Sequence, residues 1–196
     1  MISEKEFIEL VLEKSNTVVD FKNIDLRGGV NFDTQLSGVL VIIHFNHENS
    51  PTVIFTKRSS NLRNHAGEIS FPGGRVSDQD LSIIETAIRE TYEEIGLSIQ
   101  KEEIIGSLAP TNTYTTKILI YPFIVILGKL SIPFEPNEEV EKVIEIPIEI
   151  LRDRITIDEE HSSSDNQMFK LNVDDYLIWG ATARILKNLL DLVYPL

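Results

Sequence analysis

The feature that most restricts the fold of this chain is a paired-glycine turn followed by an amphipathic helix. The segment Phe71-Pro72-Gly73-Gly74 ends a stretch with little regular pattern, and paired glycines allow backbone angles that other residues resist. Apolar side chains then recur at helical spacing until Gly96, a residue type that commonly ends helices. We therefore predict a helix that begins after Asp78 or Asp80, either of which can cap it, and ends at Gly96. The residues of its apolar face are Ile84, Ile88, Thr91 and Ile95.

Runs of β-branched residues surround this helix. Strands are predicted at residues 39–45, 52–56, 103–108, 118–127 and 140–146, with a further pair at 155–157 and 168–173. Turn-forming residues separate the first two runs, which predicts a hairpin. Helices are predicted at 3–16, where Ser3 and Glu6 have the form of a capping box, and at 181–192. We expect Phe71 to pack under the glycine turn and Trp179 to anchor the last helix in the core. The pattern predicts one mixed α/β domain.

Composition excludes several classes of function. The chain has 196 residues, a net charge of −13 and no cysteine. Its negative field repels nucleic acids and anionic membranes, so neither is expected as a partner. Without cysteine there is no disulfide framework and no thiolate nucleophile. The sequence has no apolar run of about 20 residues and no basic signal-peptide start, so a cytoplasmic protein is expected.

Three glutamates on the central helix form a candidate metal site. Glu90, Glu93 and Glu94 stand at i, i+3 and i+4, which places their carboxylates on one face. Like charges this close repel one another unless a hard cation with oxygen ligands lies among them. Arg89 is placed four residues before Glu93 and can orient it, and a carbonyl of the glycine turn is a further ligand. The alternative is a solvated acidic face with no ligand.

The segment that precedes the helix is locally basic. Residues 57–75 hold four cations and one acid, which gives this stretch a charge of +3. The cations are Lys57, Arg58, Arg63 and Arg75, the acid is Glu68, and His65 lies among them. A basic loop beside an acidic, metal-binding helix suits a substrate with several phosphates. The alternative is that these cations only offset neighbouring carboxylates.

Part of this pattern resembles the signature of the Nudix hydrolase family. Gly74, Asp80 and the segment from Arg89 to Leu97 resemble the Nudix box, Gly-x5-Glu-x7-Arg-Glu-U-x-Glu-Glu-x-Gly-U, where U is a bulky aliphatic residue. The chain departs from the box at three points. Asp80 replaces the first glutamate, one extra residue precedes Arg89, and Thr91 takes an aliphatic position. These departures concern helix entry and packing more than metal ligation.

Residues 56–74 are similar to the additional signature of the coenzyme A pyrophosphatase branch, Thr-x-Arg-Ser/Ala-x3-Arg-x3-Gly-x3-Phe-Pro-Gly-Gly. Every specified position is filled, by Thr56, Arg58, Ser59, Arg63, Gly67 and Phe71 to Gly74. That branch also tends to have the extra residue before its Arg-Glu pair. The resemblance begins near Val39 and runs almost to the end. We expect a single domain over residues 1–196, in which residues 1–35 form a helical extension outside the resemblance.

The resemblance implies a fold, a reaction and a set of site residues. The fold is a mixed β-sheet sandwiched between helices, and the reaction is the metal-dependent hydrolysis of a nucleoside diphosphate linked to another group. Glu90, Glu93 and Glu94, with the Gly74 carbonyl, would bind Mg²⁺ or Mn²⁺. Glu90 and Glu93 are the candidates for the general base, and Glu94 is the best-supported metal ligand of the three. Glu139 is a further candidate ligand.

The branch also implies a substrate. Coenzyme A is cleaved at its pyrophosphate into 3′,5′-ADP and 4′-phosphopantetheine, with Arg58 and Arg63, and Lys57 or Arg75, holding the phosphates. His65 is a further candidate for a phosphate contact, and we expect the 3′-phosphate to be one anion that this loop binds.

Other functions are compatible with the same sequence. They are a Nudix hydrolase of ADP-ribose, dinucleotides or nucleoside triphosphates, and a Nudix-fold module that senses a nucleotide without cleaving it. A homodimer is expected by family analogy only.

Overall fold

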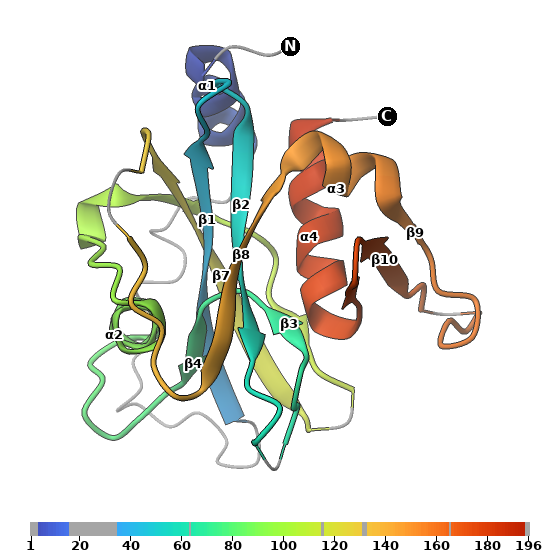
Figure 1. Cartoon of the computed structure of the whole chain (residues 1–196). Coiled ribbons are helices and arrows are strands. Elements are labelled where there is room, and N and C mark those ends of the chain that lie inside the picture. The colour runs from blue at the N-terminus through green and yellow to red at the C-terminus, as the bar shows by residue number, and fades with distance from the viewer. Residues whose placement is uncertain are drawn as a thin grey trace.

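The computed structural model describes residues 4–15, 35–62, 64–114, 116–130, 133–164 and 166–194. A mixed β-sheet forms its centre, with helix α2 (Ile83–Ile95) on one face and helix α4 (Gly180–Val193) on the other (Figure 1). The predicted sheet between helices is therefore confirmed. Within the described residues, no helix is long and apolar enough to cross a membrane.

The large sheet is built around β1 (Gln35–Phe45). It pairs antiparallel with β2 (Pro51–Arg58), which confirms the predicted hairpin, and parallel with β7 (Ile118–Leu127) on its other side. The remaining strands are β3 (Ile69–Ser70), β4 (Gly73–Arg75), β5 (Ile104–Ser107), β6 (Thr111–Asn112) and β8 (Val140–Pro147). β3 and β8 pair with β2, β5 and β6 pair with β7, and β4 pairs with the first part of β1. The paired glycines of β4 therefore lie beside the central strand β1.

Helix α2 lies directly against this sheet because Gly38 has no side chain. A Cβ at Gly38 would lie 2.4 Å from the backbone oxygen of Ile83, the first residue of α2. The helix ends at Gly96, which has a φ of 71°, as predicted. Its predicted cap is wrong. The hydroxyl of Ser82 accepts a hydrogen bond from the Glu85 N–H and caps α2, since Ser82 has an extended backbone immediately before the first turn.

The second face of the sheet is covered by α4 and by smaller elements. These are α1 (Glu4–Lys14), α3 (Ile148–Arg154) and a three-stranded sheet of β9 (Ile155–Ile157), β10 (Phe169–Val173) and β11 (Tyr176–Ile178). The predicted pairing of β9 with β10 is confirmed. Phe7 and Val11 of α1 are buried, and the ring of Phe7 lies edge-on to Phe45. Ser3 of the predicted capping box lies outside the described residues, and the division at residue 35 stays a prediction.

Two aromatic side chains were expected in the core. Phe71 is buried and its ring centroid lies 4.9 Å from that of Phe55, as expected for a residue under the glycine turn. The expectation for Trp179 is wrong, because its side chain is 43% exposed. Trp179 occupies the cap position of α4, and its neighbours Ile178 and Ala183 are buried instead.

Candidate active site

The paired glycines of β4 lie against the glutamates of α2. The Gly73 N–H donates a hydrogen bond of 3.0 Å to Oε2 of Glu94. Gly73 has a φ of 140°, a region that favours glycine, and a Cβ on it would lie 2.3 Å from a backbone oxygen of β1. A Cβ on Gly74 would lie 2.4 Å from the carboxylate of Glu90. Neither position has room for a side chain, so the backbone of the glycine turn contacts Glu90 and Glu94 directly.

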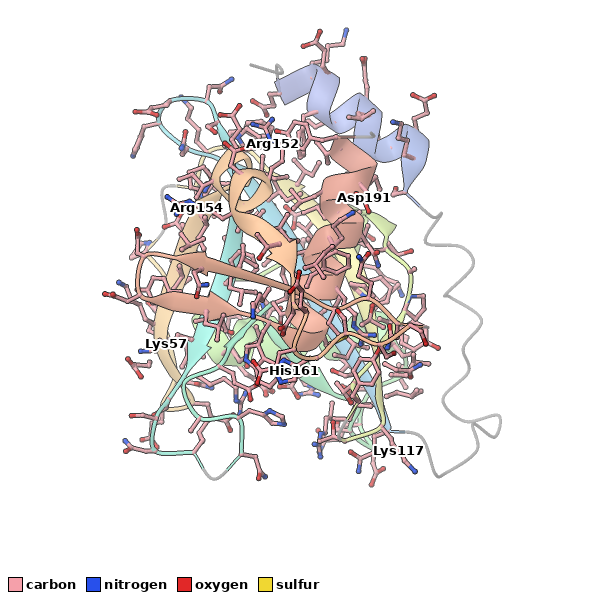
Figure 2. All side chains as sticks on the ribbon, turned by 90° about the vertical axis from the view of Figure 1, so that its right-hand side faces the viewer. Lys57, Lys117, Arg152, Arg154, His161 and Asp191 are labelled. Carbon is pink, nitrogen blue, oxygen red and sulfur yellow. The ribbon has the colours of Figure 1, made fainter. Side chains whose placement is uncertain are left out.

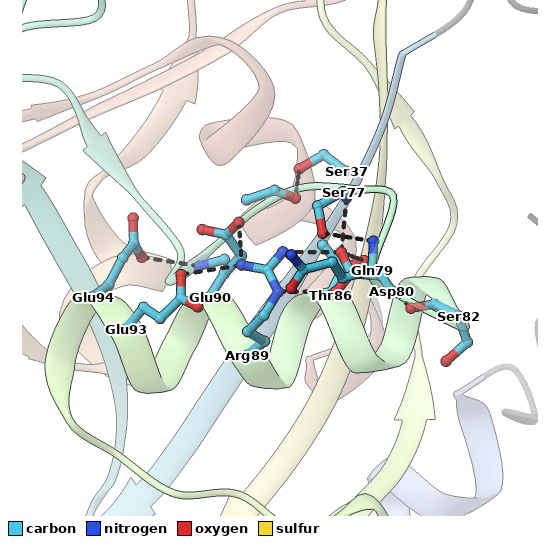
Figure 3. Close-up of polar contacts among 12 residues, drawn as sticks. Ser37, Ser77, Gln79, Asp80, Ser82, Thr86, Arg89, Glu90, Glu93 and Glu94 are labelled. Carbon is cyan, nitrogen blue, oxygen red and sulfur yellow. Dashed lines mark hydrogen bonds and ion pairs between the residues drawn. The ribbon is translucent and has the colours of Figure 1, made fainter.

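Arg89 organises the carboxylates around it (Figure 3). Its Nε and Nη2 each donate a 2.9 Å hydrogen bond to Asp80. Its Nη1 donates to Glu90 at 2.9 Å and to Glu93 at 3.1 Å, which confirms the expected contact between Arg89 and Glu93. Asp80, considered above as a cap, instead anchors this arginine. The signal in the sequence was its position in the box, where it replaces a glutamate.

Burial shifts the acidity of this cluster. The Glu94 side chain is 7% exposed, and desolvation raises its pKa to about 7. Burial also raises the pKa of Glu90, against the opposing effect of Arg89. Asp80 behaves in the opposite way, because hydrogen bonds from Arg89 hold its pKa well below the usual range. A buried carboxylate of this kind is stabilised in its charged form by a nearby cation.

The donor set fits a hard divalent cation. Glu90, Glu93 and Glu94 offer carboxylate oxygens, and the carbonyl of Gly74 is adjacent on β4. That carbonyl accepts a 2.7 Å hydrogen bond from the Ser37 hydroxyl, and backbone carbonyls are among the oxygen ligands of hard divalent cations. The three carboxylates do not converge on one point, because Glu90 and Glu93 both turn toward Arg89. Within the described chain, ligand atoms of three acidic or histidine residues all lie within 4.8 Å only at Asp158, Glu160 and His161.

Most of the described cations of the basic segment are paired with acids. Lys57 Nζ lies 2.6 Å from Glu141 and His65 Nδ1 lies 3.0 Å from Glu68. Arg75 is exposed at the end of β4, and Arg63 lies outside the described residues. These contacts are compatible with the alternative in which the cations offset neighbouring carboxylates, and the phosphate-binding role of Lys57 and His65 stays a prediction.

Arg58 is the basic residue that the fold brings to the glutamates. Its Nη1 lies 3.9 Å from Oε1 of Glu94, and its Nη2 lies 3.4 Å from Oε2 of Glu139. Its Nε is buried and has no hydrogen-bond partner. Glu139, a candidate ligand from the sequence, thus lies beside Arg58 at the start of β8. The sequence alone did not indicate these pairs, because their members are far apart in the chain.

Comparisons with known proteins agree with this geometry. A family model described as the NUDIX domain matches residues 34–165. The uncharacterized Nudix hydrolase NudL of Photorhabdus laumondii is 36% identical over 143 residues, which cover 71% of this chain and 75% of that protein. A protein of the same description from Yersinia pestis is 35% identical over 146 residues, covering 71% of both chains.

Solved structures share the fold at low sequence identity. A MutT/nudix family protein from Enterococcus faecalis matches with a TM-score of 0.60 and 16% identity, over 98% of this chain and 75% of that chain. The NUDIX domain of Shewanella oneidensis NrtR, solved in complex with ADP ribose, matches with a TM-score of 0.51 and 16% identity, over 67% and 83% of the two chains. The sequence, the sheet between helices and the glutamate-rich helix thus agree, and the chain belongs to the Nudix hydrolase family.

Proposed function

We propose that the protein is a metal-dependent hydrolase that cleaves the pyrophosphate of coenzyme A and its derivatives. Water adds to one phosphorus, the bridging phosphorus–oxygen bond breaks, and the products are 3′,5′-ADP and 4′-phosphopantetheine. The main supporting observation is the glycine turn held against Glu90 and Glu94, with Arg58 of the branch signature beside Glu94.

Other signature residues have structural positions around that turn. The hydroxyl of Thr56 lies 3.1 Å from that of Ser70, which joins β2 to β3 ahead of the turn. Gly67 has a φ of 74°, where a side chain would be strained, and Phe71 packs on Phe55. These three signature residues thus shape and hold the loop between β2 and β4. This supports the assignment to the coenzyme A branch rather than to the wider family.

The glutamates have different surroundings, which suit different roles. Glu94 is buried and fixed by the Gly73 N–H, so we assign it as a metal ligand, together with Glu90, Glu93 and the Gly74 carbonyl. Bound Mg²⁺ or Mn²⁺ neutralises charge that develops on the pyrophosphate and makes a bound water more acidic. Glu90 and Glu93 are the candidates to accept the proton, since Arg89 holds both carboxylates in place.

Arg58 is assigned as the principal phosphate-binding residue. Its buried Nε has no partner, and a guanidinium can donate two parallel hydrogen bonds to a phosphate. The contacts of Arg58 with Glu94 and Glu139, at 3.9 and 3.4 Å, are longer than those of Lys57 and His65 with glutamates, at 2.6 and 3.0 Å. The two shorter contacts must be exchanged before Lys57 and His65 can contact substrate. Lys57, His65, Arg75 and Arg63 therefore remain candidates of lower rank.

A substrate panel tests this proposal. The kcat/KM values are measured with Mg²⁺ and with Mn²⁺ for coenzyme A, ADP-ribose, a dinucleotide and a nucleoside triphosphate. We expect coenzyme A to give the highest value. A higher value for ADP-ribose, the ligand in the NrtR complex, would move the assignment to another Nudix activity. Binding of these compounds without turnover of any of them would favour a sensing module instead.

A further inference from the structure

A polar hollow lies on the α4 face of the sheet, away from the glutamates. Its volume is about 430 Å³, within the usual range for small-molecule sites. Its lining includes Asn112, Tyr114, Gln167, Phe169, Arg184 and Asn188. The residues that line it include three amide side chains, two aromatic rings and one arginine, and none of them is acidic. In a chain with a net charge of −13, this lining favours an anionic ligand, or one that forms hydrogen bonds with amide side chains.

The charge of Arg184 is not neutralised by an acid. Its guanidinium stacks on the Tyr114 ring at 4.6 Å, donates to the Tyr114 hydroxyl at 3.2 Å and donates to the carbonyl of Asn112. Its Nε is buried without a hydrogen-bond partner. No carboxylate in the described part of the chain lies within 4.0 Å of it, whereas Lys57 and Arg58 are both within that distance of glutamates. The hollow therefore contains a fixed, unbalanced positive charge.

The strand register connects the hollow to the glycine turn. Thr111 of β6 pairs with Ile120 of β7, Ile120 pairs with Ser37 of β1, and Ser37 pairs with Arg75 of β4. Paired residues point to the same face of a sheet, so this row extends from the hollow to Arg75 on the α4 face. Four adjacent strands span about 14 Å. This row sets a separation of about 14 Å between the hollow and Arg75, which follows Gly74 in β4.

We propose that this hollow binds the phosphorylated nucleoside end of the substrate, with its phosphate at Arg184 and its base beside Tyr114 and the amide side chains. This inference rests on the proposed function, because it assigns one end of the same substrate. Asparagine and glutamine offer both donors and acceptors, as a nucleobase edge requires, and the guanidinium provides the charge for a phosphate. It differs from the expectation that the basic segment binds the 3′-phosphate. Of the described basic side chains of that segment, Lys57, Arg58 and His65 already contact acids, and Arg75 is exposed at the end of β4.

Direct binding tests the hollow without catalysis. Calorimetry with the full chain in EDTA measures the affinity for 3′,5′-ADP and for adenosine. We expect Arg184→Met to weaken 3′,5′-ADP binding at least tenfold and to change adenosine binding less. Asn188→Asp serves as a second variant. It places a negative charge in the hollow, so we expect it also to weaken 3′,5′-ADP binding.

Arg152→Met is the matched control. Arg152 also lies over a tyrosine, Tyr194, at 4.8 Å, and it pairs with Asp153. In the view of the α4 face, Arg152 lies at the opposite end of the molecule from Lys117, which is three residues from Tyr114 (Figure 2). We expect this variant to bind 3′,5′-ADP as the wild type does. Circular dichroism melts of all three variants establish that each is folded.

Kinetics separate this inference from the proposed function. In the wild type, we expect a higher kcat/KM for coenzyme A than for dephospho-coenzyme A, and we expect Arg184→Met to remove most of that preference by raising KM. A folded Arg184→Met protein with wild-type affinity for 3′,5′-ADP and an unchanged preference would overturn the inference while the activity stands. The inference also fails if the wild type does not bind 3′,5′-ADP. Failure of the wild type to cleave coenzyme A, with 3′,5′-ADP still bound through Arg184, would contradict the proposed function alone.

Discussion

At the scale of single residues, Arg89 determines how the acidic face is arranged. It holds Asp80 with two hydrogen bonds and Glu90 and Glu93 with one each, so repulsion among these carboxylates is offset in place. Glu94 is outside this network and is fixed by the backbone of the glycine turn. Side chains of α2 are therefore fixed in two ways, Glu90 and Glu93 by Arg89 and Glu94 by the backbone of the glycine turn.

The division predicts the effect of Glu94→Gln. A neutral amide keeps the shape of the side chain and removes the negative charge that attracts a divalent cation. We expect kcat for the best substrate to fall by roughly a hundredfold or more, by analogy with the loss of one electrostatic group from other active sites. Initial rates at saturating Mg²⁺ measure it. The control is Glu102→Gln, an exposed glutamate outside the site, and equal activity of both variants would contradict the role of Glu94.

Asp80→Asn tests the anchor of Arg89 through pH. The folded pKa of Asp80 is lowered, so its contribution to stability is present above the unfolded pKa of about 4 and is lost as pH falls through the folded value. We expect the variant to lose about 2 kcal/mol of unfolding free energy at pH 7, as for a hydrogen bond to a charged group. The difference from wild type should shrink below about pH 4.

Urea unfolding at several pH values measures this difference. Asp78→Asn is the control, since Asp78 is exposed and lies two residues from Asp80. A constant difference between wild type and Asp80→Asn from pH 7 to pH 2 would show that ionisation of Asp80 contributes nothing.

At the scale of elements, the sequence predicts those helices and strands that are long enough to show a periodic apolar pattern. The long strands and α2 have enough residues for an apolar pattern to appear, and they lie where predicted. Strand β4 has three residues, two of them glycine, and is defined only by its pairing with β1. Helix α3 has seven residues and follows a proline, too short for a clear stripe. The cap of α2 was misassigned because several acceptors precede the helix, and only the backbone shows which one reaches the first turn.

Part of the candidate site was predictable from local sequence, and part was not. The glutamates share a helix face, so local spacing was sufficient to group them. The partners of the basic segment were not predictable, because Lys57 meets Glu141 and Arg58 meets Glu139 only through the pairing of β2 with β8. The Tyr114 and Arg184 pair is also non-local, since it joins the loop after β6 to α4. Contacts of this kind depend on topology rather than on any local pattern.

Gly38→Ala tests the close contact between β1 and α2. The new methyl group would lie 2.4 Å from the backbone oxygen of Ile83, so the helix must move or the contact remains strained. We expect a loss of about 1–3 kcal/mol of unfolding free energy, as for other overpacked sites, together with lower activity. Gly128→Ala is the control, because a Cβ there meets nothing within 4 Å. Equal stability of the two variants in urea unfolding would contradict this account of the packing.

At the scale of the whole molecule, an acidic protein is proposed to act on an acidic substrate. The net charge of −13 repels polyanions, yet Arg75 and the hollow that contains Arg184 lie near opposite ends of one row of paired residues. The glutamates themselves repel phosphate unless cations lie between them. We therefore expect a divalent cation to strengthen binding of the pyrophosphate beside the glutamates as well as to take part in its hydrolysis.

Metal removal tests this dependence. We expect EDTA to abolish hydrolysis and Mg²⁺ or Mn²⁺ to restore it. The added ion should also raise the melting temperature of the wild type, since a ligand that binds only the folded state stabilises it. Glu94→Gln should show a smaller rise. Full activity after exhaustive dialysis against EDTA would contradict a metal-dependent mechanism.

Product identification tests whether the protein hydrolyses the pyrophosphate of coenzyme A. The protein is incubated with coenzyme A and Mg²⁺ or Mn²⁺, and the products are identified by chromatography and mass spectrometry. We predict equal amounts of 3′,5′-ADP and 4′-phosphopantetheine, formed only with metal. Intact coenzyme A after prolonged incubation, or products from cleavage at any other bond, would contradict this prediction.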